Sequence, residues 1–324
     1  MRPICSAVLL LGLQLLQASC VQEQAPLPPP PKPALELIGE WGTPGDGPGQ
    51  LSRPVSIAAD FAGNVYIADA GSKYIHKFDP SGKPLLSFQD VSLKSPGGIA
   101  VDEGGGIYVT DTAGNQLLIF KPDGERFARI RRAGNGLLSG PSGVAVASDG
   151  TFYVTDLDGT RVTRYEGRLR PIYSWRLPEP APVQKGARAD VATGPDGSAY
   201  VTHSHSPVVY ATGAAGPGDA PLRVFAAEGA GSNGVAQGPL VPAKDNSASF
   251  GLSVSERHVF LVDAGSGRLT VWSVEGKPLL DSALPAAARS ENPPAFVDVV
   301  WSARRELFVL EQAGARVLRF RVNF

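Results

Sequence analysis

Acidic side chains recur at a fixed distance from an aromatic residue, and they are the first candidates for chemistry in this sequence. We call Asp69, Asp111, Asp156, Asp263 and Glu311 the acidic column, because each follows a tyrosine or phenylalanine by three positions. A carboxylate in such a place can act as a general acid or base or ligate a metal. It can equally accept hydrogen bonds from the amides of a tight turn, which every repeat would need. The recurrence favours this structural role.

One copy of the motif departs from the rest. It has His203 in place of the carboxylate and His205 two residues later. If the strands of each repeat alternate in direction, both histidines share a face with Asp190 and Asp298. Two carboxylates and two imidazoles could bind a divalent metal or polarise a substrate. The alternative is a solvated pair of carboxylates beside an exposed histidine turn. We therefore name these four residues as candidate metal or ligand residues, and we assign no catalytic residue.

Basic residues are concentrated in one stretch. Residues 121–188 contain 12 basic and seven acidic residues, although the whole chain has a formal charge of -1. This near-neutral balance gives no global reason to bind nucleic acid. An acidic glycan, a phosphorylated glycolipid or an acidic protein suits a local patch better. The alternative is a solvated sheet edge that charge protects from strand pairing. The candidate anion patch comprises Arg129, Arg131, Arg132, Arg164, Arg168 and Arg170.

The elements that position these residues are short strands in six copies. The aromatic residues of the motif are separated by 42, 45, 47, 60 and 48 residues. Upstream of the first three copies lies a strand of small residues, such as Pro96 to Ala100. Small side chains are needed where radial sheets converge on an axis. A third strand ends in an aromatic residue, and a fourth resembles Pro84 to Phe88. These four strands predict one propeller blade.

The two ends of the chain complement each other. The last copy stops at Phe324, before a fourth strand, whereas Leu35 to Trp41 is a spare strand ahead of the first copy. We predict an all-β fold, a six-bladed β-propeller of four-stranded antiparallel blades over residues 34–324. Its N-terminal strand closes the last blade, which removes the exposed sheet edges.

The first copies resemble NHL repeats. The resemblance lies in two runs, Pro54 to Asp69 and Pro96 to Asp111, and it weakens in copies four to six. It implies a propeller used chiefly as a binding platform. Related propellers include lactonases and lyases, so the fold is better determined than the function.

The N-terminus predicts export. Met1 to Ser19 has a basic residue followed by an apolar stretch, which is typical of a signal peptide. Leu16 to Cys20 resembles a bacterial lipoprotein processing site, with Cys20 as the lipidated residue, and ordinary cleavage nearby is the alternative. Residues 20–33 are rich in proline and favour an extended tether. The two cysteines lie within the first 20 residues, so the rest of the chain has no disulfide or thiolate metal site.

Together these features predict an exported, lipid-anchored monomer of the bacterial cell envelope, periplasmic or on the outer-membrane surface. We expect a non-catalytic scaffold that binds an envelope protein or acidic glycan, with the membrane contacted through the lipid anchor only. The alternative is a metal-dependent, lactonase-like hydrolase or lyase with its site at the channel mouth. Metal content separates the two, because the enzyme would need a divalent metal and the scaffold needs no cofactor.

Overall fold

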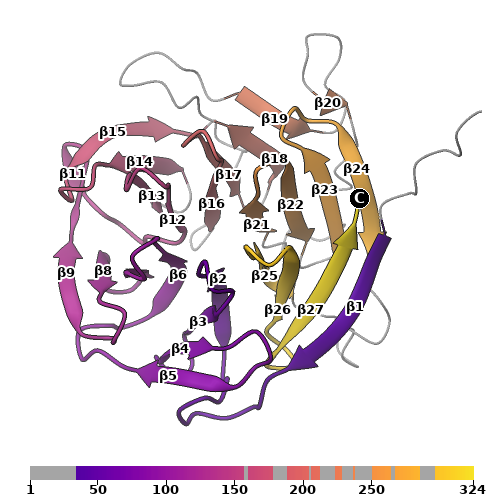
Figure 1. Cartoon of the computed structure of the whole chain (residues 1–324). Coiled ribbons are helices and arrows are strands. Elements are labelled where there is room, and N and C mark those ends of the chain that lie inside the picture. Colours follow the sequence, from indigo (N-terminus) through magenta and orange to yellow (C-terminus); the bar gives the residue numbers. More distant parts are fainter. Residues whose placement is uncertain are drawn as a thin grey trace, which may run out of the picture. The chain divides into compact units, whose positions relative to one another are not determined.

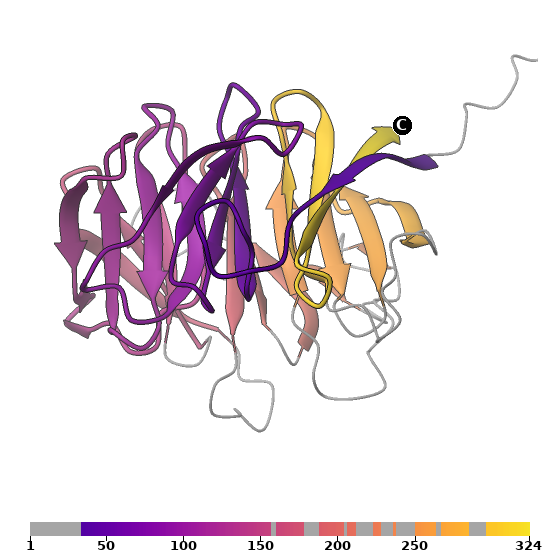
Figure 2. The same ribbon diagram turned by 90° about the horizontal axis from the view of Figure 1, so that it is seen from below.

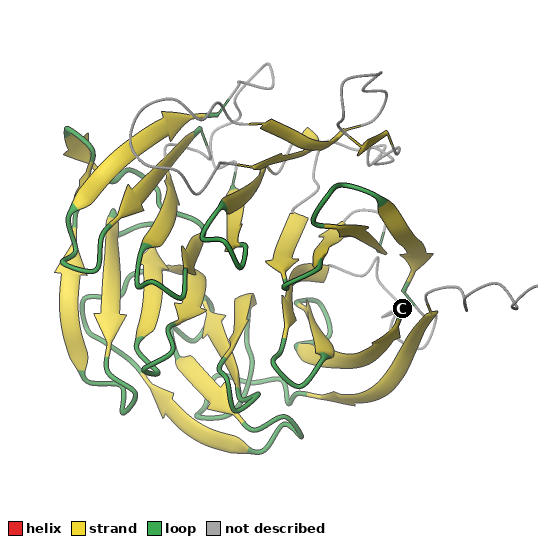
Figure 3. Ribbon diagram, turned by 45° about the horizontal axis from the view of Figure 1, so that its top comes forward, coloured by secondary structure: helices red, strands yellow, loops and turns green. Residues whose placement is uncertain are grey.

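The described part of the chain is an all-β propeller. The computed structural model describes residues 34–156, 160–177, 188–203, 206–211, 223–227, 236–237, 250–263, 267–284 and 296–324. Six sheets stand around a central axis, each with its innermost strand beside that axis (Figure 1). Figure 3 shows strands joined by loops throughout the described residues. In this part of the chain no helix is long and apolar enough to cross a membrane.

Each blade follows the chain from its inner to its outer strand. Blade 1 consists of β2 (Pro54–Ala59), β3 (Val65–Asp69), β4 (Ile75–Phe78) and β5 (Pro84–Phe88). Blade 2 consists of β6 (Pro96–Val101), β7 (Ile107–Asp111), β8 (Gln116–Phe120) and β9 (Arg126–Ile130). Blade 3 consists of β12 (Val144–Val146), β13 (Phe152–Asp156), β14 (Arg161–Tyr165) and β15 (Pro171–Arg176). Blade 4 consists of β16 (Ala189–Thr193), β17 (Ala199–His203), β18 (Ser206–Ala211) and β19 (Arg223–Ala227). Blade 5 consists of β21 (Phe250–Val254), β22 (His258–Asp263), β23 (Arg268–Ser273) and β24 (Pro278–Ala283). The chain contributes β25 (Phe296–Trp301), β26 (Glu306–Glu311) and β27 (Arg316–Asn323) to blade 6.

Burial explains why the second strands carry the clearest sequence motif. All five residues of β3, β7 and β13 are buried, because each of these strands is covered by neighbouring blades on both faces. Such strands favour continuous β-branched and aromatic residues. The outer strands β5 and β9 are partly exposed, and β9 carries two arginines. The core is therefore a set of apolar layers between adjacent blades.

The two ends of the described propeller meet in blade 6, as predicted. Strand β1 (Ala34–Trp41) pairs antiparallel with β27, from Ala34 opposite Asn323 to Trp41 opposite Val317. Figures 1 and 2 show these two strands side by side at the periphery. Leu35 and Leu37 pack against the core of blades 5 and 6. Ion pairs also join the strands, with Arg316 Nη1 lying 3.0 Å from Glu40 Oε2.

Small residues let the inner strands approach each other. A Cβ added to Gly251 would lie 2.4 Å from Cα of Asp298 in the next blade. One added to Gly98 would lie 2.5 Å from the carbonyl oxygen of Ser142, and one on Gly143 would lie 2.8 Å from that of Ala189. The prediction that small residues line the axis is confirmed at these positions.

The structure also departs from the expected blade in three places. Strand β12 is shorter than the inner strands of blades 1 and 2 and begins at Val144, and the Gly143 amide ahead of it donates to the Thr155 hydroxyl at 2.8 Å. A short hairpin, β10 (Arg132–Ala133) with β11 (Gly136–Leu137), precedes blade 3. In blade 4, β20 (Ala236–Gln237) adds a parallel fifth strand. The sequence also predicts a glycine-rich insertion after β18, from Thr212 to Ala220, and these residues lie outside the described part of the chain.

The close approach at the axis generates a stability prediction. We expect Gly251→Ala to lower the free energy of unfolding by about 1–3 kcal/mol, because the added methyl group meets the backbone of Asp298. Gly39→Ala, in β1, is the matched control, since nothing lies within 4 Å of its added Cβ. Urea unfolding of both variants measures the difference. Equal stability of the two variants would contradict the proposed crowding at the axis.

Candidate functional site at the channel mouth

The acidic column serves the turns at the ends of the second strands. The buried carboxylate of Asp69 accepts hydrogen bonds from the amides of Ser52 and Arg53 at 2.6 and 3.0 Å. It also accepts them from the amides of Gly71 and Ser72 at 2.8 and 3.1 Å. One side chain thus holds the segment that leads into the inner strand against the turn after the second strand. The structural interpretation of this residue is confirmed.

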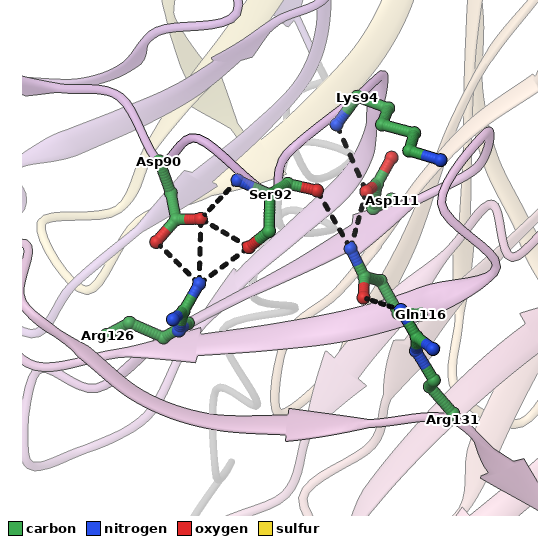
Figure 4. Close-up of polar contacts among 7 residues, drawn as sticks. All are labelled: Asp90, Ser92, Lys94, Asp111, Gln116, Arg126 and Arg131. Carbon is green, nitrogen blue, oxygen red and sulfur yellow. Dashed lines mark hydrogen bonds and ion pairs between the residues drawn. The ribbon is translucent and has the colours of Figure 1, made fainter.

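Asp111 repeats this arrangement in blade 2 (Figure 4). Its carboxylate accepts hydrogen bonds from the amides of Lys94, Ser95 and Gly114, and from Gln116 Nε2 at 2.8 Å. Gln116 Nε2 also donates to the carbonyl oxygen of Ser92 at 2.9 Å. In blades 3 and 6 an arginine takes the place of this glutamine, and Arg161 and Arg316 pair with Asp156 and Glu311. These carboxylates are already bonded to the protein.

Asp190 and Asp298 lie at the axis of the ring, as predicted. Asp190 pairs with Thr202 and Asp298 pairs with Leu310, each one residue before the end position of the second strand. Ser56 and Gly251 occupy the same register position in blades 1 and 5. The six inner strands therefore bring two carboxyl groups into one channel, although blades 4 and 6 are not adjacent.

Both carboxyl groups bond across a blade boundary. Asp298 Oδ2 accepts hydrogen bonds from Ser56 Oγ at 2.7 Å and from the Ile57 amide at 2.9 Å, which joins blade 6 to blade 1. Asp190 Oδ2 accepts one from the Leu252 amide at 2.9 Å, which joins blade 4 to blade 5. The inner carboxylates thus connect blades by hydrogen bonds, as Ser56 Oγ also does by accepting one from the Ile99 amide at 3.2 Å, whereas the glycine positions rely on close backbone contact.

Burial dominates the electrostatics of this pair. Burial raises the pKa of Asp298 to about 6. Burial and then the charge of Asp298 raise the pKa of Asp190 well above its usual value. Two buried carboxyl groups near each other do not readily ionise together. The pair therefore retains a proton at pH values where isolated aspartates are ionised.

A cavity of about 260 Å³ opens at this end of the channel, and we call it the mouth cavity. Asp190 and Asp298 line it together with two arginines, Arg53 and Arg188. Ser56 and Gly98 contribute to its wall. Sequence reasoning missed both arginines. Their position directly before the inner strands of blades 1 and 4 is the signal that identifies them.

The two predicted histidines do not extend this site in the described structure. His203 is buried and pairs opposite Ala189, which packs with Val191 against Tyr153 of blade 3. Asp190 is the next residue along β16, so its side chain points to the other face of that strand. His205 and the candidate lipidation residue Cys20 lie outside the described residues.

The described donor set fits a divalent metal poorly. No group of three or more histidine, cysteine, aspartate or glutamate side chains is arranged for a metal within the described residues. Both carboxyl groups accept hydrogen bonds from backbone amides, and two guanidinium groups line the same cavity. Positive charge in the wall of the cavity opposes the binding of a cation. The proposal of a divalent metal would need ligands beyond those that the structure describes.

The six arginines of the candidate anion patch come from two neighbouring blades. Arg129 is on β9, Arg132 begins β10, and Arg131 lies between these strands. Arg168 and Arg170 lie in the turn between β14 and β15, where Leu169 packs against the apolar cluster that contains Ile130 and Ala133. The Tyr165 hydroxyl, at the end of β14, donates to the carbonyl oxygen of Arg132 at 2.6 Å. Arg164, on β14, places its guanidinium 5.9 Å from the ring centroid of Tyr153.

The shared proton generates a pH prediction. A raised pKa means that the folded state binds more protons than the unfolded state, so stability falls as pH rises from about 4 through 6. A tenfold difference in proton affinity between the two states corresponds to about 1.4 kcal/mol of stability. Asp190→Asn mimics the protonated side chain. We therefore expect the free energy of unfolding of the wild type to fall relative to that of Asp190→Asn between pH 5 and pH 8.

The measurement is urea unfolding of both proteins at several pH values. The pKa of the buried His76 is lowered to about 4, which gives a pH dependence of opposite sign below pH 6.5. Because both proteins contain His76, its effect cancels in the comparison. Parallel stability curves for the two proteins would show that the pair does not hold an extra proton.

The comparisons with known proteins agree with the architecture. The NHL repeat model matches residues 93–120, which include β6, β7 and β8. No curated protein matches the sequence. Among solved structures, a streptogramin B lyase is 13% identical with a TM-score of 0.60, covering 90% of this chain and 98% of that one.

Two further structures are similar in the same way. The virginiamycin B lyase of Staphylococcus aureus is 13% identical with a TM-score of 0.56, covering 90% of both chains. A gluconolactonase of Xanthomonas campestris is 16% identical with a TM-score of 0.57, covering 85% of this chain and 88% of that one. At these identities the likeness concerns the fold alone. The chain is thus a six-bladed β-propeller that contains an NHL repeat.

Proposed function

We propose that this chain is a non-catalytic binding scaffold of the bacterial cell envelope. The observation that carries the proposal is that Asp69 and Asp111, carboxylates of the recurring acidic column, are bonded to backbone amides of the propeller itself. A carboxylate engaged in this way stabilises the fold and is a poor general base. Export and lipidation at Cys20 complete the proposal, since they place the propeller at a membrane surface.

Binding is proposed for the face that surrounds the channel mouth. We define this mouth face by the segments that lead into the inner strands, among them residues 52–53, 91–95 and 136–140. Val91 is fully exposed there, and Leu137 is 67% exposed. A hollow of about 350 Å³ on this face is lined by Lys94, Arg131 and Leu137. Apolar and cationic side chains together suit an acidic protein partner.

The charges of this hollow come from neighbouring elements. Lys94 lies in the segment before β6, and its amide bonds to Asp111 while its side chain points away from that carboxylate (Figure 4). Arg131 follows β9 and donates to Gln116 Oε1 at 3.3 Å. Neither has an ion pair within the described residues. The hollow therefore presents two positive charges to a partner.

Capture from envelope extracts tests the proposed face. We expect the immobilised propeller to retain a partner that is lost, by about tenfold or more, when Lys94→Glu and Leu137→Asp are combined. Phe61→Asp is the matched control, because Phe61 is 72% exposed in the turn between β2 and β3, at the opposite end of the blade. Retention analysed by mass spectrometry and glycan staining distinguishes a protein from a glycan.

One outcome would contradict the choice of face and another would contradict the scaffold. Loss of the partner in Phe61→Asp but not in the mouth variant would place binding on the other face. Stoichiometric divalent metal in the purified wild-type protein, absent from Asp190→Asn and Asp298→Asn, would instead support the metal-dependent hydrolase or lyase. This second function is tested because the chain has the same fold as a known lyase and a gluconolactonase.

The lipid anchor is tested separately. We expect Cys20→Ser to move the protein from the membrane fraction to the soluble fraction of the bacterial envelope, because the acyl chains that hold it would be missing. Metabolic labelling with a fatty acid measures the modification directly. Unchanged membrane association and labelling in Cys20→Ser would exclude this residue as the anchor.

A further inference from the structure

The described chain enters the propeller on the face opposite the channel mouth. Inner strands begin at the mouth and the strands of a blade alternate in direction, so β27, the third strand of blade 6, ends at the other face. Ala34, the first residue of β1, pairs opposite Asn323 at that end of β27. Figure 2 shows the start of β1 and the end of β27 together. Residues 1–33, which include Cys20, are therefore attached to the ring on this face.

Aromatic side chains surround this entry point. Phe324 follows β27 and is 43% exposed, and its ring stacks on that of His258 with the centroids 3.8 Å apart. The ring of Trp301, at the end of β25, lies 6.5 Å from that of Phe324 and stacks on Phe260 at 4.9 Å. These rings come from blades 5 and 6. The start of β1 is thus bordered by a partly exposed aromatic cluster.

The aromatic surface continues into blade 1. Arg304 Nε, in the turn after β25, donates to the carbonyl oxygen of Ala62 at 2.9 Å, which joins the turns of blades 6 and 1. Phe61, next to Ala62, is 72% exposed. Exposed aromatic rings that lie close together on one face mark a contact surface. We define the entry patch as Phe61, Arg257, Trp301, Arg304, Arg305 and Phe324.

Arginines flank the aromatic rings of the entry patch. Arg257 is exposed in the turn before β22, and Arg304 and Arg305 are exposed in the turn after β25. Glu256 and Glu275, in turns of blade 5, offset part of this charge. The net charge of the patch is therefore small, and the aromatic rings must supply most of its affinity.

The carboxylates beside the patch on blades 1 and 6 have cationic partners. Asp60 Oδ2 lies 3.4 Å from Lys77 Nζ, and Glu306 Oε1 lies 2.6 Å from Arg319 Nη2. These two carboxylates are also partly buried. They consequently add little negative charge to the surface that Phe61 and Arg304 share.

We propose that the entry patch contacts the surface of the lipid bilayer to which the chain is anchored. Aromatic rings favour the membrane–water interface, and arginine side chains bury their stems there while their guanidinium groups meet lipid phosphates. Residues 20–33 can span at most about 50 Å, so an anchor at Cys20 keeps the patch close to the bilayer. A single acyl chain alone binds a membrane weakly and reversibly, and a second contact makes the attachment stable.

The inference rests on the proposed function only in that the anchor brings the patch to a membrane. It goes beyond the expectation that the membrane is contacted through the lipid anchor only, because here the propeller itself touches the bilayer. The orientation follows from the same contact. With the entry patch against the lipid, the mouth face points away from the membrane and towards a partner.

Vesicles of phosphatidylethanolamine and phosphatidylglycerol are the probe. The protein is the full chain with Cys20→Ser, so that no acyl chain at this residue contributes. We expect Phe61→Asp combined with Phe324→Asp to lower its partitioning onto the vesicles by about tenfold or more. Val91→Asp combined with Leu137→Asp is the matched control, because it replaces two exposed apolar residues on the mouth face. This control should bind like the parent protein.

The comparison is protected against two artefacts. All variants share residues 1–33, so any binding by that segment is the same in each. Phe324 packs on His258, and circular dichroism with urea unfolding establishes whether its replacement is tolerated. If it is not, Phe61→Asp alone carries the test, because Phe61 lies exposed in a turn. We expect this single variant to lower partitioning by about threefold or more.

Hydrogen exchange of the vesicle-bound protein measures the orientation. We expect the amides of residues 60–64 and 302–306, in the turns of the entry patch, to exchange more slowly when vesicles are added. Residues 91–95 and 136–140, on the mouth face, should exchange at an unchanged rate. Slower exchange at the mouth face instead would overturn the proposed orientation and the patch with it.

The entry patch and the proposed function can fail separately. Equal partitioning of the Phe61→Asp, Phe324→Asp variant and its parent would overturn the patch. If the mouth face then still captures a partner that Lys94→Glu with Leu137→Asp loses, the scaffold stands without it. Conversely, lower partitioning of the patch variant supports the patch even where Cys20→Ser leaves acylation and membrane association unchanged.

Discussion

The close approach of six inner strands around one axis is the constraint on which the rest of the molecule depends. Where the position nearest the axis is Gly98, Gly143 or Gly251, the next blade comes so near that a methyl group has no space. Where it is Asp190 or Asp298, the side chain bridges to an amide of the next blade. Both solutions connect neighbouring sheets, and they leave the polar groups of the channel in fixed positions.

The carboxylates further from the axis are also held by hydrogen bonds that connect separate segments. A buried carboxylate is costly unless it is well bonded, and Asp69 and Asp111 each receive several turn donors. Each of these side chains joins the segment leading into an inner strand to the turn after the second strand. The mouth face is thus built on a rigid frame, and its exposed side chains are available for a partner. This division between bonded and exposed groups supports a binding role.

The fold was largely predictable because its repeat is local and its chemistry recurs. The spacing of Tyr66, Tyr108 and Tyr153 located the second strands, and the spare strand ahead of blade 1 located the closure. The site was less predictable. The repeat register predicted that Asp190 and Asp298 lie on inner strands. Arg53 and Arg188 instead lie in irregular segments, where no strand periodicity predicts the direction of a side chain. His203 shows the same limit, since strand parity turns it towards blade 3.

Closure by β1 has a mechanical consequence. A pull on the chain ahead of Ala34 enters the ring through a strand that pairs with β27 from Ala34 opposite Asn323 to Trp41 opposite Val317. Force along β1 loads all of these hydrogen bonds in shear, so that they yield together. Force across it peels them apart one after another, starting at Ala34. A propeller held by its N-terminus would therefore resist tension best when the pull runs along its outermost strand.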